Sequence, residues 1–128
     1  MSTKKVSEGE ERPITSRDQL VQPMQDGEKS AERWRIGTEH EKLVFRKADK
    51  RAPSYTETGG IRDMLHAMER FGWEPVLEGG NVIAMSGTDG AISLEPAGQL
   101  ELSGAPLENL HQTCAETGRH LDQVKAIG

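Results

Sequence analysis

The stretch Ser93-Leu94-Glu95-Pro96-Ala97-Gly98-Gln99-Leu100-Glu101-Leu102-Ser103 decides the fold. A strand alternates its side chains between two faces. One face then carries the polar or small residues Ser93, Glu95, Ala97, Gln99, Glu101 and Ser103. The other face carries Leu94, Leu100 and Leu102. We therefore expect a strand over residues 91–103, with a bulge at Pro96 and Gly98 where a ligand approaches, because proline removes a ladder donor and glycine weakens a strand.

A second informative stretch is Ile36-Gly37-Thr38-Glu39-His40-Glu41-Lys42. Glu39 and Glu41 are two residues apart and share a face. Carboxylates held side by side repel each other unless a cation neutralises them. Mg²⁺ prefers hard oxygen ligands and completes its octahedron with nucleotide phosphates and water. If both stretches lie in one sheet, Glu39, Glu41, Glu95 and Glu101 converge on one acidic surface, and the spacing leaves open a metal site or a solvated acidic face.

The pattern around the histidines and the cysteine indicates structural roles for them. His40 alternates to the face opposite the two glutamates, which indicates a packed or surface histidine. The histidines on the expected helices lack metal-ligand spacing to one another; they are His66, His111 and His120. Cys114 lies on an apolar helix face, which predicts a buried, unreactive thiol. No phosphate-binding glycine loop, CxxC pair or nucleophile elbow occurs.

The flanking sequence predicts an α+β domain with an antiparallel sheet and flanking helices. A stripe of apolar residues at three- and four-residue spacing predicts a helix over 61–71, closed by Gly72 in a left-handed conformation. Strands over 73–77 and 82–86 are joined by Glu78-Gly79-Gly80-Asn81, and the turn at 87–90 leads into the strand 91–103. Gly and Asn tolerate positive φ, so these joints favour an antiparallel meander.

The outer elements complete the prediction. Ser16 with Gln19 has the form of a capping box that opens a short helix, which Pro23 and Asp26-Gly27 close. Residues 35–46 form a strand candidate. Pro106 suits the first turn of a final helix, whose apolar face comprises Leu107, Leu110, Cys114, Thr117, Leu121 and Val124. That helical pattern still runs at Gly128, so we expect the domain to continue beyond it.

Composition excludes several classes of protein. The chain has 21 acidic and 16 basic residues, a net charge of −5, and no basic cluster. This balance argues against a nucleic-acid partner and against docking on an anionic membrane, and no apolar run is long enough to span one. Residues 1–13 are expected to form a disordered, solvated tail. The N-terminus lacks a secretory signal and is too acidic for a transit peptide, so we expect a cytoplasmic protein.

Three segments together resemble glutamate–cysteine ligases of the plant and proteobacterial type. They are residues 35–42 (RIGTEHEK), residues 93–116 (SLEPAGQLELSGAPLENLHQTCAE) and residues 120–126 (HLDQVKA). The match covers residues 14–128, which we interpret as the N-terminal part of a ligase catalytic domain that is incomplete at its C-terminus. One difference is Ala97-Gly98, where the family pattern has a Gly-Gly pair. A methyl group at that position is a mild change.

The resemblance implies a partial glutamine synthetase-like fold, in which acidic side chains on the inner face of a curved sheet hold Mg²⁺ around ATP and L-glutamate. By that resemblance Glu39, Glu41, Glu95 and Glu101 bind the metal and the nucleotide phosphates, and Gln99 binds substrate. No residue of this chain is implied as a catalytic nucleophile. The partners implied are ATP, L-glutamate, L-cysteine and the remainder of the same enzyme chain.

The implied reaction is the first step of glutathione biosynthesis. ATP phosphorylates the γ-carboxylate of glutamate, and the amine of cysteine attacks the acyl phosphate. Such chemistry requires mainly positioning and charge neutralisation. We expect residues 1–128 to be inactive alone, because the basic groups for the phosphoryl transfer and much of the cysteine site would lie elsewhere. Two other hypotheses remain: a non-catalytic acidic domain that binds a cation or a partner, and another carboxylate–amine ligase of the same superfamily.

Overall fold

The computed structural model describes residues 13–88 and 90–128. The chain divides into two compact units, one up to Trp34 and the other from Arg35 to Gly128. The predicted disordered tail, except Pro13, lies outside the described residues. Each unit is considered by itself.

The first unit contains the helix α1 (Asp18–Asp26) and the short 3₁₀ helix η1 (Ala31–Arg33). The predicted capping box is confirmed. The backbone N–H of Ser16 donates to Gln19 Oε1 over 3.2 Å, and the Gln19 N–H donates to Ser16 Oγ over 3.4 Å. The helix continues through Pro23 and ends at Gly27, whose N–H reaches the Pro23 carbonyl. The two hydrogen bonds of the box satisfy backbone donors that would otherwise be unpaired at the helix start.

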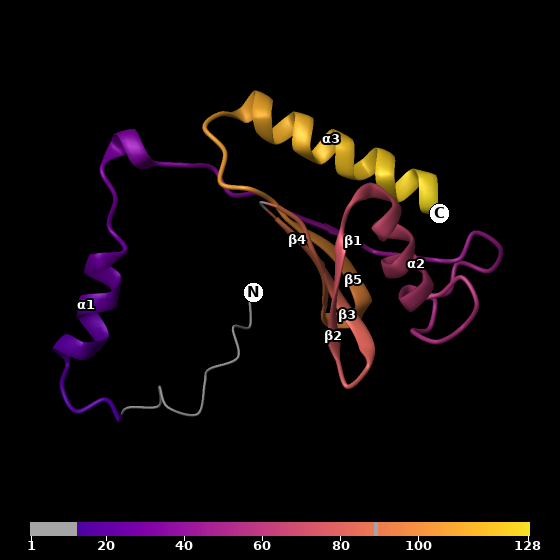
Figure 1. Ribbon diagram of the computed structural model, residues 1–128, viewed down its shortest axis with the longest axis horizontal. Helices are drawn as coiled ribbons and strands as arrows, with labels where there is room; N and C mark the ends of the chain where they lie inside the picture. The colour runs from indigo at the N-terminus through magenta and orange to yellow at the C-terminus, as the bar shows by residue number, and fades with distance from the viewer. Residues whose placement is uncertain (1–12, 89) are drawn as a thin grey trace. The chain divides into compact units, whose positions relative to one another are not determined.

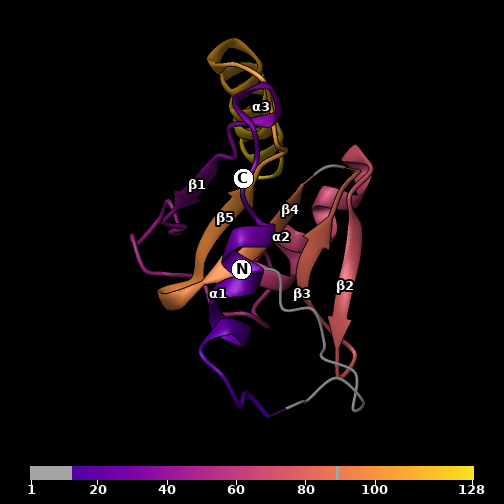
Figure 2. The same cartoon turned by 90° about the vertical axis from the view of Figure 1, so that its left-hand side faces the viewer.

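The second unit is built on a five-stranded antiparallel sheet of order β1-β5-β4-β3-β2, which confirms the predicted α+β class and meander. Figure 2 shows the strands fanning out from β1 at one edge to β2 at the other. Gly79 and Gly80 both have positive φ and form the β2–β3 turn. The strands are β1 (Glu39–Lys42), β2 (Glu74–Glu78), β3 (Asn81–Ser86), β4 (Ala91–Glu95) and β5 (Gln99–Ser103).

The prediction of one strand over residues 91–103 is wrong. The segment is a hairpin, in which the single turn η3 (Pro96–Gly98) reverses the chain between β4 and β5. Ala97 and Gly98 adopt left-handed backbone conformations, with φ of 65° and 74°. Proline lacks a ladder donor and glycine tolerates positive φ, so the features that suggested a bulge produce a complete reversal.

One face of the sheet is apolar and carries both helices of this unit, α2 (Ile61–Ala67) and α3 (Leu110–Ile127) (Figure 1). The short 3₁₀ helix η2 (Met68–Phe71) continues α2 and ends at Gly72, which has the predicted left-handed conformation with φ of 87°. The stripe predicted for residues 61–71 supplies Ile61, Leu65 and Met68 to the core. They pack with Val82, Met85, Ile92, Leu100 and Leu102.

Two outer elements are shorter than predicted. The strand expected over 35–46 is reduced to the four residues of β1, preceded by a single bridge between Ile36 and Leu107. That bridge holds residue 107 in an extended segment, so α3 begins only at Leu110 instead of at Pro106. The Asn109 side chain caps α3 by accepting a hydrogen bond from the Gln112 N–H over 3.1 Å, which satisfies a donor at the start of the helix.

The face of α3 that packs on the sheet also differs from the prediction. His120 is its buried residue, while Leu110 is exposed. The prediction of a buried Cys114 is therefore wrong, because that thiol is exposed. Of the predicted apolar face, Val124 packs against the core, and the buried His120 adds a polar group that the apolar pattern does not include. No helix among the described residues is long and apolar enough to cross a membrane.

Candidate functional site

The register of three strands places all five predicted site residues on one face of the sheet. Glu41 lies directly opposite Glu101, and Glu95 lies directly opposite Gln99. Glu39 lies opposite Ser103, two positions from Glu101 along β5. Residues opposite each other in an antiparallel pair project to the same side. This surface, formed by Glu39, Glu41, Glu95, Gln99 and Glu101, is called the carboxylate face below.

The five residues share a face even though residues 91–103 form a hairpin instead of one strand. All five have odd numbers, so they lie on the same face within each strand. The β4–β5 hairpin pairs odd-numbered residues with odd-numbered ones, such as Ser93 with Glu101. The predicted convergence depended only on β1 and the segment 91–103 lying in one sheet, and they do. The face is opposite the one that packs against α2 and α3.

Glu101 is the central group of the carboxylate face. It is only 3% exposed, and its strand β5 lies between β1 and β4. The Ser103 hydroxyl donates to its Oε1 over 2.6 Å. Glu101 makes none of the ion pairs found among the described residues. A buried carboxylate needs hydrogen-bond donors or a cation to compensate its charge, and here the Ser103 hydroxyl is one such donor.

Two further observations concern the polar groups around Glu101. Like charges directly opposite each other in a sheet are destabilising, by about 0.2–1 kcal/mol for such pairs, yet Glu41 faces Glu101. The hydroxyl of Ser93, the other cross-strand neighbour of Glu101, is buried without a hydrogen-bond partner in the described structure. A cation or a polar ligand at this point would relieve the repulsion and satisfy the hydroxyl.

A positive charge that interacts with Glu101, that of Lys42, belongs to the opposite face. Burial lowers the pKa of Lys42, and the charge of Glu101 raises it by a smaller amount. The Lys42 ammonium donates to the His40 carbonyl over 2.5 Å and lies 3.0 Å from His40 Nδ1. His40 is half-buried there, as predicted. Lys42 therefore does not occupy the carboxylate face.

The carboxylate face is extended, and its members are not all neighbours. Glu39 and Glu95 lie at opposite ends, about 13 Å apart along the strands at roughly 3.4 Å per residue. Among the described residues, no three His, Cys, Asp or Glu side chains are placed so that they could hold one metal ion together. The structure brings Glu41 and Glu101 together, with Glu39 and Glu95 as flanking groups.

This donor set fits Mg²⁺ in one specific way. Mg²⁺ in phosphate-transferring sites is commonly bound by one or two carboxylates, with substrate phosphates and water as its other ligands. The pair Glu41 and Glu101 supplies that number of hard oxygen donors. A cage made by the protein alone is not formed by the described residues. A hollow of about 240 Å³ beside Glu39, lined also by Gly37, Thr38, Ser103 and Gly104, adds space at one end of the face.

Sequence reasoning assigned no role to the two hydroxyls of Ser93 and Ser103. Both were placed on the polar face by alternation, and that alternation was the available signal. What it could not show was burial: the Ser93 Oγ has no partner, and the Ser103 hydroxyl is used by Glu101.

Comparison with known proteins identifies the family. A family model described as glutamate-cysteine ligase family 2 (GCS2) matches residues 35–128, the second of the two units. The chain is 53% identical over 116 residues to the chloroplastic glutamate–cysteine ligase of Nicotiana tabacum, covering 90% of this chain and 22% of that protein. The corresponding enzyme A of Oryza sativa subsp. japonica is 52% identical over 117 residues, covering 91% and 23%.

The same relatives correct one prediction. The chloroplastic enzyme of Arabidopsis thaliana is 48% identical over 116 residues, and like the others it is named for the plastid. These names contradict the cytoplasmic location expected from the sequence. That expectation rested on the composition of the residues near Met1, and composition there is independent of the folded core that the relatives share.

The chain spans about a fifth of the length of the curated relatives that it matches. The family match nevertheless covers every strand and both helices of the second unit, including all five residues of the carboxylate face. On this evidence, the chain belongs to glutamate-cysteine ligase family 2.

Proposed function

We propose that this chain forms part of an ATP-dependent ligase that joins the γ-carboxylate of L-glutamate to the amine of L-cysteine, the first step of glutathione biosynthesis. The names of the relatives support the reaction, and the chemistry of the carboxylate face supports its dependence on a metal and a nucleotide. The observation that carries the proposal is the pair Glu41 and Glu101, two carboxylates held opposite each other on one strand pair.

The proposed reaction has two steps. The γ-carboxylate of glutamate takes the terminal phosphoryl group of ATP, which gives an acyl phosphate and ADP. The cysteine amine then attacks the acyl carbon and releases phosphate. Neither step requires a protein nucleophile, and positioning with charge neutralisation is the main contribution of the protein. Mg²⁺, when bound, would neutralise phosphate charge and orient the phosphates.

The residues of this chain have distinct proposed roles. Glu41 and Glu101 would hold Mg²⁺, and the Ser103 hydroxyl would fix the orientation of the Glu101 carboxylate through its 2.6 Å hydrogen bond. Glu39 and Glu95, at the two ends of the face, would bind a second ion or the water ligands of the first. Gln99, half-buried opposite Glu95, would bind substrate through its neutral amide.

The carboxylate face is proposed to be one wall of the complete site. Its five members carry four negative charges and no positive one, whereas phosphoryl transfer also needs cationic groups on the transferred phosphoryl. The rest of a longer enzyme chain would supply those groups and the cysteine-binding residues. A partial glutamine synthetase-like architecture, with the face lining the inside of a curved sheet, is part of the same proposal.

A chimera tests the function directly. Residues 35–128 would replace the matching segment of the full-length tobacco relative, and formation of γ-glutamylcysteine would be followed. The proposal predicts ATP hydrolysis at roughly 1–1000 per second that requires glutamate and cysteine together. A folded chimera that hydrolyses ATP only with a different amine would favour another carboxylate–amine ligase. A folded chimera without any turnover would contradict the proposal.

A further inference from the structure

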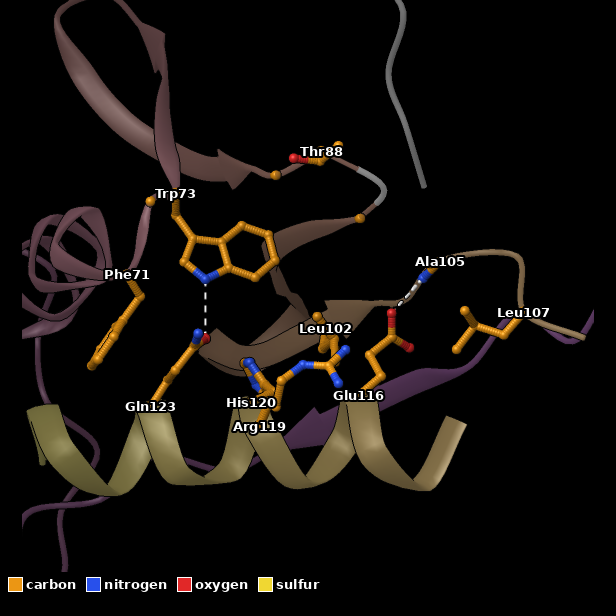
Figure 3. A pocket seen from close by; sticks show the side chains of 13 residues that line it. Phe71, Trp73, Thr88, Leu102, Ala105, Leu107, Glu116, Arg119, His120 and Gln123 are labelled. Carbon is orange, nitrogen blue, oxygen red and sulfur yellow. Dashed lines mark hydrogen bonds between the residues drawn. The ribbon is translucent and has the colours of Figure 1, made fainter. Parts of the chain in front are cut away.

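A separate pocket of about 300 Å³ lies on the helix-covered side of the sheet, opposite the carboxylate face. It opens between α3 and the turns that follow η2 and β3. Figure 3 shows Glu116, Arg119, His120 and Gln123 projecting from α3 toward Trp73 and Leu102. Binding pockets for small molecules occupy about 300–1,000 Å³, so this pocket suits a small ligand.

Unpaired buried polar atoms are concentrated at this pocket. Four buried side-chain atoms in the described residues lack a hydrogen-bond partner, and three of them line it: Glu116 Oε2, His120 Nδ1 and His120 Nε2. His120 is 2% exposed. Buried polar groups in native proteins are almost always paired, and an exception calls for a missing ligand or water.

The carboxylate of Glu116 is held in a fixed place at the pocket. Its Oε1 accepts a hydrogen bond from the Ala105 N–H over 2.8 Å, which leaves Oε2 without a partner. The carboxylate also lies against Gly104, where a Cβ atom would come within 2.2 Å of Oε2. A positioned, shielded carboxylate oxygen favours a ligand that brings a charged donor, such as an ammonium group.

The other residues that line the pocket indicate which further groups the ligand carries. Arg119, one helical turn along from Glu116, is exposed and makes none of the ion pairs found in the described part of the chain. Its guanidinium is therefore available for a carboxylate. Trp73 is oriented by its indole N–H, which donates to Gln123 Oε1 over 3.0 Å. Its ring packs over Gly87, and Leu102 and Leu107 add further apolar surface.

We propose that this pocket binds a free α-amino acid with an aliphatic side chain. The ammonium group pairs with Glu116, the carboxylate pairs with Arg119, and the side chain lies against Trp73 and Leu102. Burial lowers the pKa of His120 to about 4, so the imidazole is neutral at pH 7 and offers one donor and one acceptor to the ligand. The site is separated from the carboxylate face by the sheet, and the inference stands independently of the proposed reaction.

Tryptophan fluorescence of the 128-residue chain tests this site, with L-leucine as the probe. Trp34 and Trp73 are the only tryptophans, so Trp34→Phe makes the signal report on the pocket. We expect a saturable change with half-saturation in the range of about 0.1–10 mM. N-acetyl-L-leucine, which lacks the ammonium, and L-leucinamide, which lacks the carboxylate, should each bind about tenfold more weakly or worse.

Two variants assign the contacts. Glu116→Gln keeps an oxygen acceptor for the Ala105 N–H but removes the charge, and Arg119→Gln changes an exposed side chain that is not needed for folding. Each should weaken L-leucine binding about tenfold or more, with an unchanged circular dichroism spectrum. The proposal is overturned if L-leucine gives no saturable change up to about 50 mM, or if it binds Arg119→Gln as well as the unaltered pocket. Binding of either capped analogue as tight as that of L-leucine would also overturn it.

Discussion

Glu41 on β1 and Glu101 on β5 lie directly opposite each other in the register of the sheet, and Glu101 is almost fully buried. Two negative charges in this arrangement are unfavourable in the absence of a cation. The unpaired hydroxyl of Ser93 lies on the other side of Glu101. The strands that complete the core on one face therefore place two carboxylates and an unpaired hydroxyl side by side on the other.

Ala97→Gly should stabilise the chain. Ala97 has φ of 65°, a left-handed conformation that is costly for residues with a Cβ, whereas glycine adopts it readily. We expect a gain of about 1 kcal/mol in the free energy of unfolding, reduced by the greater freedom of glycine in the unfolded chain. Urea unfolding measures it, and a loss of stability would show that the turn does not hold this conformation.

Gly87→Ala should destabilise the chain by about 1–3 kcal/mol. A Cβ at Gly87 would come within 2.7 Å of the Trp73 ring, so the indole would have to move. Gly37→Ala is the matched control, because a Cβ there meets nothing within 4 Å. Thermal melting of both variants checks the packing, and equal melting temperatures would contradict the observed position of Trp73.

His120 should make stability depend on pH. Burial, with smaller contributions from Lys42 and His40, lowers its pKa from 6.5 to about 4 in the folded state. Between these values the unfolded chain binds more protons than the folded one, so stability is present above pH 6.5 and is lost as the pH falls toward 4. The loss amounts to about 3 kcal/mol at most, from 1.36 kcal/mol per unit.

The control for this pH effect is His120→Leu, which removes the titrating group. Urea unfolding at pH 7, 6 and 5 should show a decline for the unaltered chain that is markedly smaller in the variant. The same decline in both would show that groups other than His120 carry the effect.

Residues 1–128 by themselves should show no ligase turnover. The carboxylate face has no positive group, and phosphoryl transfer needs cationic stabilisation of the transferred group. The assay is ATP hydrolysis that depends on glutamate and cysteine together. Turnover of the isolated chain at roughly 1–1000 per second would show that it contains a complete site.

Much of the architecture could be predicted from the sequence because local patterns agreed with the final fold. The stripe of α2, the left-handed Gly72 and the two-glycine turn between β2 and β3 are local signals, and the structure confirms them. The composition of the carboxylate face followed from alternation alone. The β4–β5 hairpin pairs odd-numbered residues with odd-numbered ones. The same residues therefore share a face whether the segment bulges or reverses.

The wrong or missing predictions concern features that depend on contacts between elements distant in the sequence. The exposed Cys114 and the buried His120 depend on which side of α3 meets the sheet, and the apolar pattern of the helix alone does not fix that side. The burial of Glu101 was also not predictable, because alternation assigns a residue to a face of the sheet without showing how far that face is covered. Pockets formed between distant segments, such as that between Trp73 and Glu116, leave no contiguous sequence signal.

The most direct test of the proposed metal role is the Mg²⁺ dependence of the chimeric ligase with Glu101→Gln or Glu41→Gln. Glutamine preserves shape and removes charge, so the change isolates metal binding from packing. Each variant should require about 10–100-fold more Mg²⁺ for half-maximal rate and have a lower maximal rate. His40→Gln, on the opposite face, and Glu78→Gln, on the exposed strand β2, are the controls and should be nearly silent. Glu57 is unsuitable as a control because it pairs with Arg46 over 2.9 Å. Wild-type rate and Mg²⁺ dependence in Glu101→Gln would contradict the metal assignment.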